Sequence, residues 1–220
     1  MNRLLIKLEY FFYFFKSKIL KKKIFTIEEI NTLNFKKKIS GYKFKDFWFL
    51  NNVETINYFL PKFKDIKFDY LEIGSHEGMS LLNILEQYKN VRATCIDLWS
   101  DGVVEKVFDE NFKNFKNLEK IKSDSIIALR KLKDNNREFD YIYIDGLHEG
   151  THVLMDAIQS FKLLKLNGII IFDDFMQYDK SLLYKSYEGI YCFLKLLKKQ
   201  IKILYFQNKK YLAATTCICF

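Results

Sequence analysis

The sequence contains few prolines, glycines and cysteines. Its 220 residues include one proline and eight glycines, so long flexible linkers between domains are not expected. The four cysteines form neither a Cys-x-x-Cys pair nor a Cys/His set with zinc-ligand spacing. We therefore expect reduced, buried thiols in a cytoplasmic protein, at Cys95, Cys192, Cys217 and Cys219.

A hydrophobic run long enough for a membrane helix is also missing from the N-terminal region. The apolar stretch at residues 4–15 contains Lys7 and Glu9 and is too short, because a membrane span needs about 20 apolar residues. It lacks the small-residue cleavage site of a signal peptide. The aromatic helix expected here packs on the rest of the chain, on a second subunit of a homo-oligomer, or on the inner membrane surface, where the lysines of residues 1–23 would meet anionic lipid.

The net positive charge is confined to the N-terminal part. Residues 1–45 hold twelve Lys or Arg and three Glu, so they carry the whole net charge of +9. The rest of the chain is neutral, whereas a domain that grips nucleic acid normally carries clustered positive charge on its folded surface. We therefore do not expect nucleic acid as a partner. The hydrophobic content of 49% and charged content of 29% are typical of a globular protein.

From Phe68 onward, strand-like and helix-like patterns alternate. Alternating units of this kind require right-handed crossovers and a parallel sheet. The expected strands are 68–73, 91–96, 118–122, 139–144 and 168–172, and the expected helices are 79–88, 104–115, 125–132, 151–164 and 182–198.

Two more strand-like runs, 201–206 and 211–219, are separated by only four residues, which predicts an antiparallel hairpin. The sequence thus predicts an α/β fold of the Rossmann-like, doubly wound type, with a mostly parallel sheet that ends in an antiparallel hairpin. We expect residues 68–220 to form this domain and residues 1–67 to form a basic, aromatic, helical N-terminal arm.

The turn after the first expected strand is the most informative local motif. Residues 69–80 read DYLEIGSHEGMS, and their glycines lie four positions apart, unlike the G-x-G-x-x-G of dinucleotide binders. Ligands of such sheets bind beyond the carboxyl ends of the strands, where small residues let the backbone approach. Glu72 either binds a cationic amino-acid group of a ligand or caps amides of the turn. The candidate residues of this turn are Glu72, Gly74, Ser75, Gly78 and Ser80.

Polar residues also follow the second and third expected strands. An acid such as Asp97 can accept hydrogen bonds from both ribose hydroxyls of a nucleotide, or it can begin a turn. Trp99 either lies against an adenine or packs in the core. Ser123 and Asp124 suit the N-cap of the next helix.

Three carboxylates, those of Asp145, Asp173 and Asp174, follow the fourth and fifth expected strands. Unpaired carboxylates at neighbouring strand ends raise one another's pKa, and a divalent cation such as Mg²⁺ removes that penalty. The alternative is a set of helix caps and turn residues. His148, three residues beyond Asp145, suits a general base, because imidazoles titrate near neutral pH; otherwise it is a structural histidine bonded to a carboxylate.

Three segments together resemble class I S-adenosylmethionine (SAM) dependent methyltransferases: DYLEIGSHEGMS, ATCIDLW and FDYIYIDGLHEGTHVLMDAIQSFKLLKLNGIIIFDDF. The resemblance covers about residues 68–216 and is nearest to small-molecule O-methyltransferases of the catechol, caffeoyl-CoA and sugar-modifying types. It departs from their pattern at His76 and Glu77, where small or aromatic residues are common.

The resemblance implies a function and a site. The function is methyl transfer from SAM to a hydroxyl of a small molecule, a sugar or another diol, with help from a divalent cation, expected to be Mg²⁺. Asp145, Asp173 and Asp174 are the implied metal ligands, and His148 and Asp145 the implied catalytic residues. The implied SAM site comprises Glu72, Gly74, Ser75, Gly78, Ser80, Asp97, Trp99, Ser123 and Asp124.

Two other functions compete with this one. An NAD-dependent oxidoreductase or epimerase shares the acid after the second strand, but it requires G-x-G-x-x-G and commonly a Tyr-x-x-x-Lys pair, which the sequence does not place after a suitable helix. A non-catalytic, membrane-associated binding module is the second alternative. The intact acids at the strand ends argue against such a loss of activity.

Overall fold

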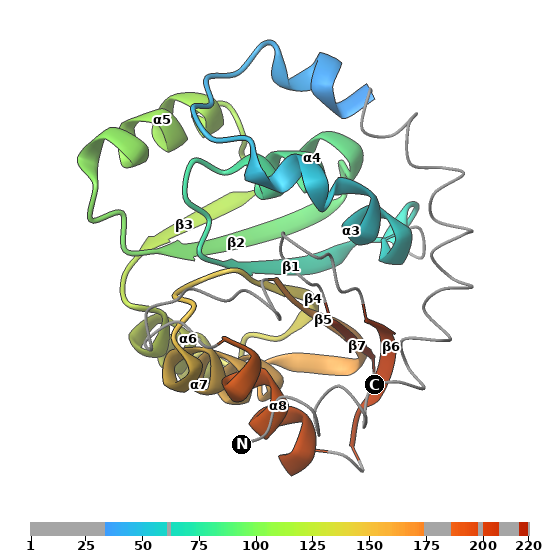
Figure 1. The fold of residues 1–220 in the computed structure, drawn as a ribbon. Coiled ribbons are helices and arrows are strands. Elements are labelled where there is room, and N and C mark those ends of the chain that lie inside the picture. The colour runs from blue at the N-terminus through green and yellow to red at the C-terminus, as the bar shows by residue number, and fades with distance from the viewer. Residues whose placement is uncertain (1–33, 61–62, 174–185, 198–199, 207–215, 220) are drawn as a thin grey trace.

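A computed structural model describes residues 34–60, 63–173, 186–197, 200–206 and 216–219. One seven-stranded sheet runs through the molecule in the order β3-β2-β1-β4-β5-β7-β6 (Figure 1). Its strands are β1 (Phe68–Ile73), β2 (Val91–Asp97), β3 (Leu118–Lys122), β4 (Phe139–Ile144), β5 (Leu164–Phe172), β6 (Lys202–Phe206) and β7 (Thr216–Cys219).

Strands β1 to β5 pair in parallel, and β7 is antiparallel to both β5 and β6. The predicted α/β fold, with its parallel sheet and closing antiparallel hairpin, is confirmed. Placing β7 between β5 and β6 distinguishes the sheet from the 3-2-1-4-5-6 order of dinucleotide-binding domains.

Helices cover both faces of the sheet (Figure 1). On one face lie α3 (Val53–Phe59), α4 (Met79–Gln87) and α5 (Gly102–Phe112), preceded by the short 3-10 helix η1 (Trp48–Asn51). On the other lie α6 (Ser125–Asp134), α7 (Gly150–Phe161) and α8 (Ser186–Leu196). This arrangement follows from the right-handed crossovers of successive strand–helix units.

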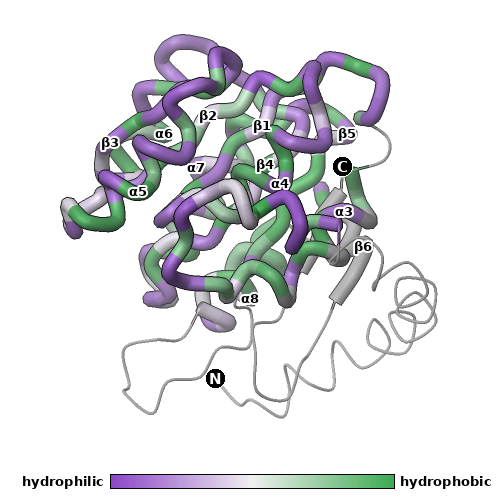
Figure 2. The backbone as a smooth tube through the Cα atoms, turned by 90° about the horizontal axis from the view of Figure 1, so that it is seen from above, coloured by the Kyte–Doolittle hydropathy of each residue, from purple (hydrophilic) through white to green (hydrophobic). Residues whose placement is uncertain are grey.

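Successive side chains of a strand point to opposite faces of the sheet, so each face has its own hydrophobic core. In β1, Phe68 and Tyr70 pack with α3 and α4, whereas Leu71 and Ile73 pack with the helices of the opposite face. Fully burying an apolar side chain of this size contributes about 1.5–3 kcal/mol, so a one-residue slip of the register would be costly. Figure 2 shows the hydrophobic residues gathered along the central strands and the hydrophilic residues on the outer turns.

Strand β5 begins four residues earlier than predicted, at Leu164 instead of Gly168. The pairing between β4 and β5 shifts register between Phe139 and Tyr141, and Asn167 takes a left-handed φ of 62°. The pattern of apolar residues identified only the regular end of this strand, because the residues before Gly168 form an irregular, partly exposed stretch.

The described part of the N-terminal arm is built into the domain. Phe35, Ile39, Phe49 and Val53 are buried in the same core as β1 and α4. The aromatic run at residues 4–15 lies outside the described residues. Within the described residues, no helix combines the length and apolar character needed to cross a bilayer.

Candidate active site

Backbone hydrogen bonds bring the carboxyl ends of four strands into one row. The Gly74 N–H donates to the carbonyl of Ile96, near the end of β2, at 2.9 Å. The N–H of Asp145 donates to the carbonyl of Ile73, the last residue of β1, at 2.9 Å. The N–H of Asp173 donates to the carbonyl of Ile144, the last residue of β4, also at 2.9 Å. The first residues after β1, β4 and β5 therefore lie side by side, as expected for a ligand site of a parallel sheet.

Two glycines shape the turn after β1. Gly74 has φ 85° and Gly78 has φ 88°, a left-handed backbone conformation that residues other than glycine rarely adopt. A Cβ on Gly74 would lie 2.0 Å from the carbonyl oxygen of Asp145, and one on Gly78 would lie 2.2 Å from the ring of Phe112. The spacing of these glycines thus serves close packing of the turn against the loop after β4 and against α5.

Glu72 lies beneath this turn and is fully buried. Its carboxylate accepts hydrogen bonds from Tyr70 Oη at 2.5 Å and from Ser80 Oγ at 2.8 Å. Burial raises the pKa of Glu72 to about 7, against the opposing effect of these hydrogen bonds. Both alternatives for Glu72 remain, but the hydrogen bonds show that it fixes Ser80 at the start of α4. Ser75 is also buried in the turn.

Asp97, the last residue of β2, holds the turn from its other side. Its carboxylate accepts the N–H of His76 at 2.9 Å and the N–H of Trp99 at 2.7 Å. The indole Nε1 of Trp99 donates to the carbonyl of His76 at 2.9 Å, and the ring is buried against Phe108. Each carboxylate oxygen retains lone-pair capacity for a ribose hydroxyl.

Ser123 and Asp124 lie beside Asp97 at the end of β3. The N–H of Ser123 donates to the Asp97 carbonyl at 3.0 Å. The Asp124 carboxylate accepts the N–H groups of Ile126 and Ile127, as the N-cap of α6. The structure therefore brings these two residues next to the acid at the end of β2.

The acids after β4 and β5 converge on one hydroxyl. Tyr143 Oη donates to Oδ2 of Asp145 at 3.3 Å and makes a shorter hydrogen bond to Asp173. Burial, together with the charges of these two acids, raises the pKa of Tyr143 well above its usual value, so it stays a neutral donor. Asp174, the third expected ligand, lies outside the described residues.

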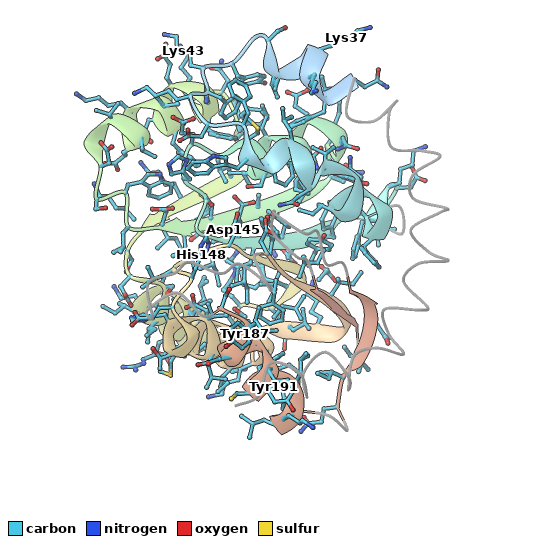
Figure 3. All side chains as sticks on the ribbon, in the orientation of Figure 1. Lys37, Lys43, Asp145, His148, Tyr187 and Tyr191 are labelled. Atoms are coloured by element: carbon cyan, nitrogen blue, oxygen red, sulfur yellow. The ribbon has the colours of Figure 1, made fainter. Side chains whose placement is uncertain are left out.

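His148 lies against Asp145, with Nε2 at 3.6 Å from Oδ1 (Figure 3). Both side chains are about one-third exposed, at 29% and 30%. The loop between β4 and α7 supplies both residues, so the imidazole borders the carboxylates and remains open to solvent.

Sequence reasoning missed two residues of this cluster, Tyr143 and Asn52. Tyr143 is two positions before Asp145, so strand alternation could have placed its side chain on the same face. Asn52 is buried and donates its side-chain amide to Asp173 at 2.5 Å. No local pattern marks Asn52, because its partner is 121 positions away.

Comparison with known proteins bears on this fold and site. Residues 71–175 match a family described as a methyltransferase domain. No curated protein matches the sequence significantly.

Several solved structures share the fold. An O-methyltransferase from Bacillus cereus, in complex with SAH (S-adenosylhomocysteine), is 16% identical, with a TM-score of 0.57 over 84% of this chain and 96% of that chain. A Staphylococcus aureus protein provisionally described as a caffeoyl-CoA O-methyltransferase is 16% identical, with a TM-score of 0.61 over 92% and 100%. The mycinamycin-pathway methyltransferase MycE, in complex with Mg, SAH and mycinamycin VI, is 14% identical, with a TM-score of 0.59 over 84% and 54%.

The strand order, the glycine turn and the family match define a class I, SAM-dependent methyltransferase domain. The predicted identity of the chain as a SAM-dependent methyltransferase is confirmed. Neither the sheet order nor the glycine spacing favours the NAD-dependent alternative, and the family match does not favour a non-catalytic module.

Proposed function

We propose that the protein transfers the methyl group of SAM to a hydroxyl oxygen of a small molecule, a sugar or another diol. The observation that carries this proposal is the direct packing of the glycine turn, residues 74–78, on the loop after β4 that carries Asp145. A Cβ on Gly74 would lie only 2.0 Å from the carbonyl oxygen of Asp145, so the proposed donor and acceptor sites adjoin. The complex of the Bacillus cereus O-methyltransferase with SAH, and that of MycE with Mg, SAH and mycinamycin VI, support the proposal.

The donor site is formed by residues at the ends of β1, β2 and β3. Gly74, Ser75 and Gly78 let the backbone approach the ligand, and Glu72 with Ser80 lies at its amino-acid end. Asp97 accepts the ribose hydroxyls, while Ser123 and Asp124 border the adenine; Trp99 underlies the turn and lies toward the adenine side.

Mg²⁺ suits the residues at the ends of β4 and β5. Asp145 and Asp173 share the hydroxyl of Tyr143, so two hard oxygen donors converge at one place, and Asp174 follows directly in sequence. These three acids would hold the ion. When bound, it would lower the pKa of an acceptor hydroxyl and offset the repulsion between the carboxylates.

The protein's own groups perform the remaining work. His148, oriented by Asp145, accepts the proton of the acceptor hydroxyl. The acceptor oxygen then forms a bond to the methyl carbon as the carbon–sulfur bond of SAM breaks, which leaves neutral SAH. Holding oxygen, carbon and sulfur in line is an orientation effect that the rigid strand ends supply.

The test is formation of SAH and a methylated product from SAM with a panel of nucleotide sugars, free sugars and catechols. We expect turnover that is stimulated by Mg²⁺, reduced by a chelator, and lost in Asp145→Asn. Asp101→Asn is the matched control, because Asp101 caps α5 and does not belong to the acids that follow β4 and β5. If neither a chelator nor Asp145→Asn lowered turnover, the metal would be removed from the mechanism.

Other expectations stay predictions. They are the boundary between residues 67 and 68, cytoplasmic location, contact of residues 1–23 with the inner membrane surface, homo-oligomer formation and the absence of a nucleic-acid partner. A vesicle-flotation assay with and without residues 1–23 tests the membrane contact.

A further inference from the structure

A second group of potential metal ligands lies on the other side of the glycine turn. We propose that Asp46, His76 and Glu77 bind a divalent transition-metal ion, with Zn²⁺ as the representative case. One ligand atom from each residue lies within 4.8 Å of the others, and no other such group of three occurs among the described residues. Asp46 belongs to the loop before η1, whereas His76 and Glu77 belong to the turn after β1.

The spacing of these atoms leaves room for an ion. His76 Nε2 and Asp46 Oδ2 are 3.9 Å apart, too far for a direct hydrogen bond. Zinc lies about 2.0–2.2 Å from nitrogen and oxygen ligands, so two ligands of one ion are separated by up to about 4.4 Å. Small side-chain rotations would bring all three groups to that distance.

A buried oxygen without a partner points to a ligand at this place. Glu77 is 2% exposed, and its Oε2 accepts the N–H groups of Lys45 at 2.7 Å and Asp46 at 3.2 Å. Its Oε1 is buried, and no donor of the described chain reaches it. Burying a carboxylate oxygen with no donor is costly, and a cation held with His76 and Asp46 would satisfy it.

His76 is held firmly in a conformation that few residues adopt. Its φ is 50°, in the left-handed region. Asp97 binds its N–H, Trp99 binds its carbonyl, and the Trp48 ring lies against the imidazole with centroids 5.7 Å apart. These contacts fix the ring beside the two acids before any ion arrives, which is the preorganisation that a ligand site requires.

The chemistry and exposure of the group indicate which ion fits. One imidazole nitrogen with two carboxylates suits Zn²⁺, Co²⁺ or Mn²⁺ better than Mg²⁺, which prefers oxygen ligands alone. The His76 and Asp46 side chains are 43% and 39% exposed, so an ion has a path from solvent and water can complete its coordination. The bound ion would tie the loop before η1 to the glycine turn.

Titration with Co²⁺ and Zn²⁺ tests the site, in excess Mg²⁺ so that the acids after β4 and β5 are occupied. We expect one Co²⁺ to bind per chain and to give the visible absorption bands of nitrogen coordination. Zn²⁺ should displace this Co²⁺, which calorimetry measures. Asp46→Asn, His76→Asn and Glu77→Gln should each weaken binding by more than about 100-fold, the upper end of what loss of an outer-sphere partner costs. Asn is chosen at His76 because it tolerates a positive φ.

His152→Asn is the matched control, since His152 pairs with Glu149 at 3.0 Å on α7, outside the proposed site. It should bind Co²⁺ as the wild type does, and so should Asp145→Asn, which separates this site from the proposed Mg²⁺ site. Circular dichroism checks folding, and the part-exposed Asp46→Asn and His76→Asn decide the matter if Glu77→Gln does not fold. Undiminished binding in those two variants, or no Co²⁺ bands in the wild type, would overturn the proposal.

Discussion

The side-chain amide of Asn52 donates a 2.5 Å hydrogen bond to the carboxylate of Asp173, across 121 positions of sequence. Both residues are buried. Asn52 directly precedes α3, so this bond joins the N-terminal segment to the end of β5. Together with the hydroxyl of Tyr143, it fixes one of the two carboxylates of the candidate active site.

Replacing Asn52 by Leu removes the amide donor with little change in volume. We expect turnover to fall about tenfold or more, because the Asp173 carboxylate is no longer held in place. The free energy of unfolding should fall by about 1–3 kcal/mol, the cost of a buried polar group that loses its partner. Steady-state kinetics and denaturant unfolding measure the two effects.

Asn57→Leu provides the control for this variant. Asn57 lies on α3 and exchanges side-chain hydrogen bonds with Asn83, away from the acids. It should lose stability without losing turnover at saturating substrate. Equal loss of turnover in the two variants would show that Asn52 acts through general stability alone.

Gly74→Ala should disrupt the site and the fold around it. The added Cβ would meet the backbone of Asp145 at 2.0 Å, in a residue with φ 85°. Left-handed strain alone costs about 1–3 kcal/mol, and backbone cannot yield as a side chain can, so we expect a total of at least about 3 kcal/mol. Gly102→Ala is the counterpart, because nothing lies within 4 Å of its Cβ. Thermal unfolding should show a large loss for the first variant and little change for the second.

Glu72→Gln should change how stability depends on pH. The pKa of Glu72 is raised by burial from 4.5 to about 7 in the folded state. Its contribution to stability is therefore fully present below pH 4.5 and is lost as pH rises through about 7, by about 3 kcal/mol at most. Gln removes this titration, so the fall in the free energy of unfolding over that window should become shallower.

Asp156 must be considered in the same measurement. Burial raises its pKa from 3.8 to about 6, so it contributes a loss of stability of the same sign in a lower pH window. Asp156→Asn should flatten the curve below about pH 6 and leave the higher part unchanged. A curve that is identical in wild type and Glu72→Gln would show that Glu72 ionises normally.

His148→Gln should lower the rate of methyl transfer by about 10²- to 10⁴-fold, the usual contribution of a general base. SAM affinity should stay unchanged, because His148 lies against Asp145 and not in the glycine turn. His152→Gln, four positions on and paired with Glu149, should retain full activity. Rescue of His148→Gln by added imidazole would support proton transfer, whereas an unaffected rate would exclude His148 as the base.

The sequence predicted the sheet well because the strands are short, apolar and regularly separated by helical patterns. The bounds predicted for Phe68–Ile73, Leu118–Lys122 and Phe139–Ile144 agree with the structure. Strand β5 was less predictable, since its irregular first half carries little apolar alternation. The predicted positions at the strand ends lie at one edge because the parallel topology leaves no other arrangement.

The contribution of the N-terminal segment could not be read from sequence. Asn52 and Asp46 lie in a region with no motif, and each meets its partners only through the tertiary fold. For Trp99, the sequence left two roles open, contact with an adenine and packing in the core. The structure adds a hydrogen bond from its indole Nε1 to the carbonyl of His76. Long-range hydrogen bonds of this kind have no local signature.

Calorimetric titration with SAM tests the central claim most directly. We expect one SAM per chain with a dissociation constant of about 1–100 µM, no heat with NAD, and binding at least about tenfold weaker in Asp97→Asn than in the control Asp101→Asn. An absence of binding at millimolar SAM, or binding of NAD in its place, would contradict the assignment of the glycine turn and Asp97 to a SAM site.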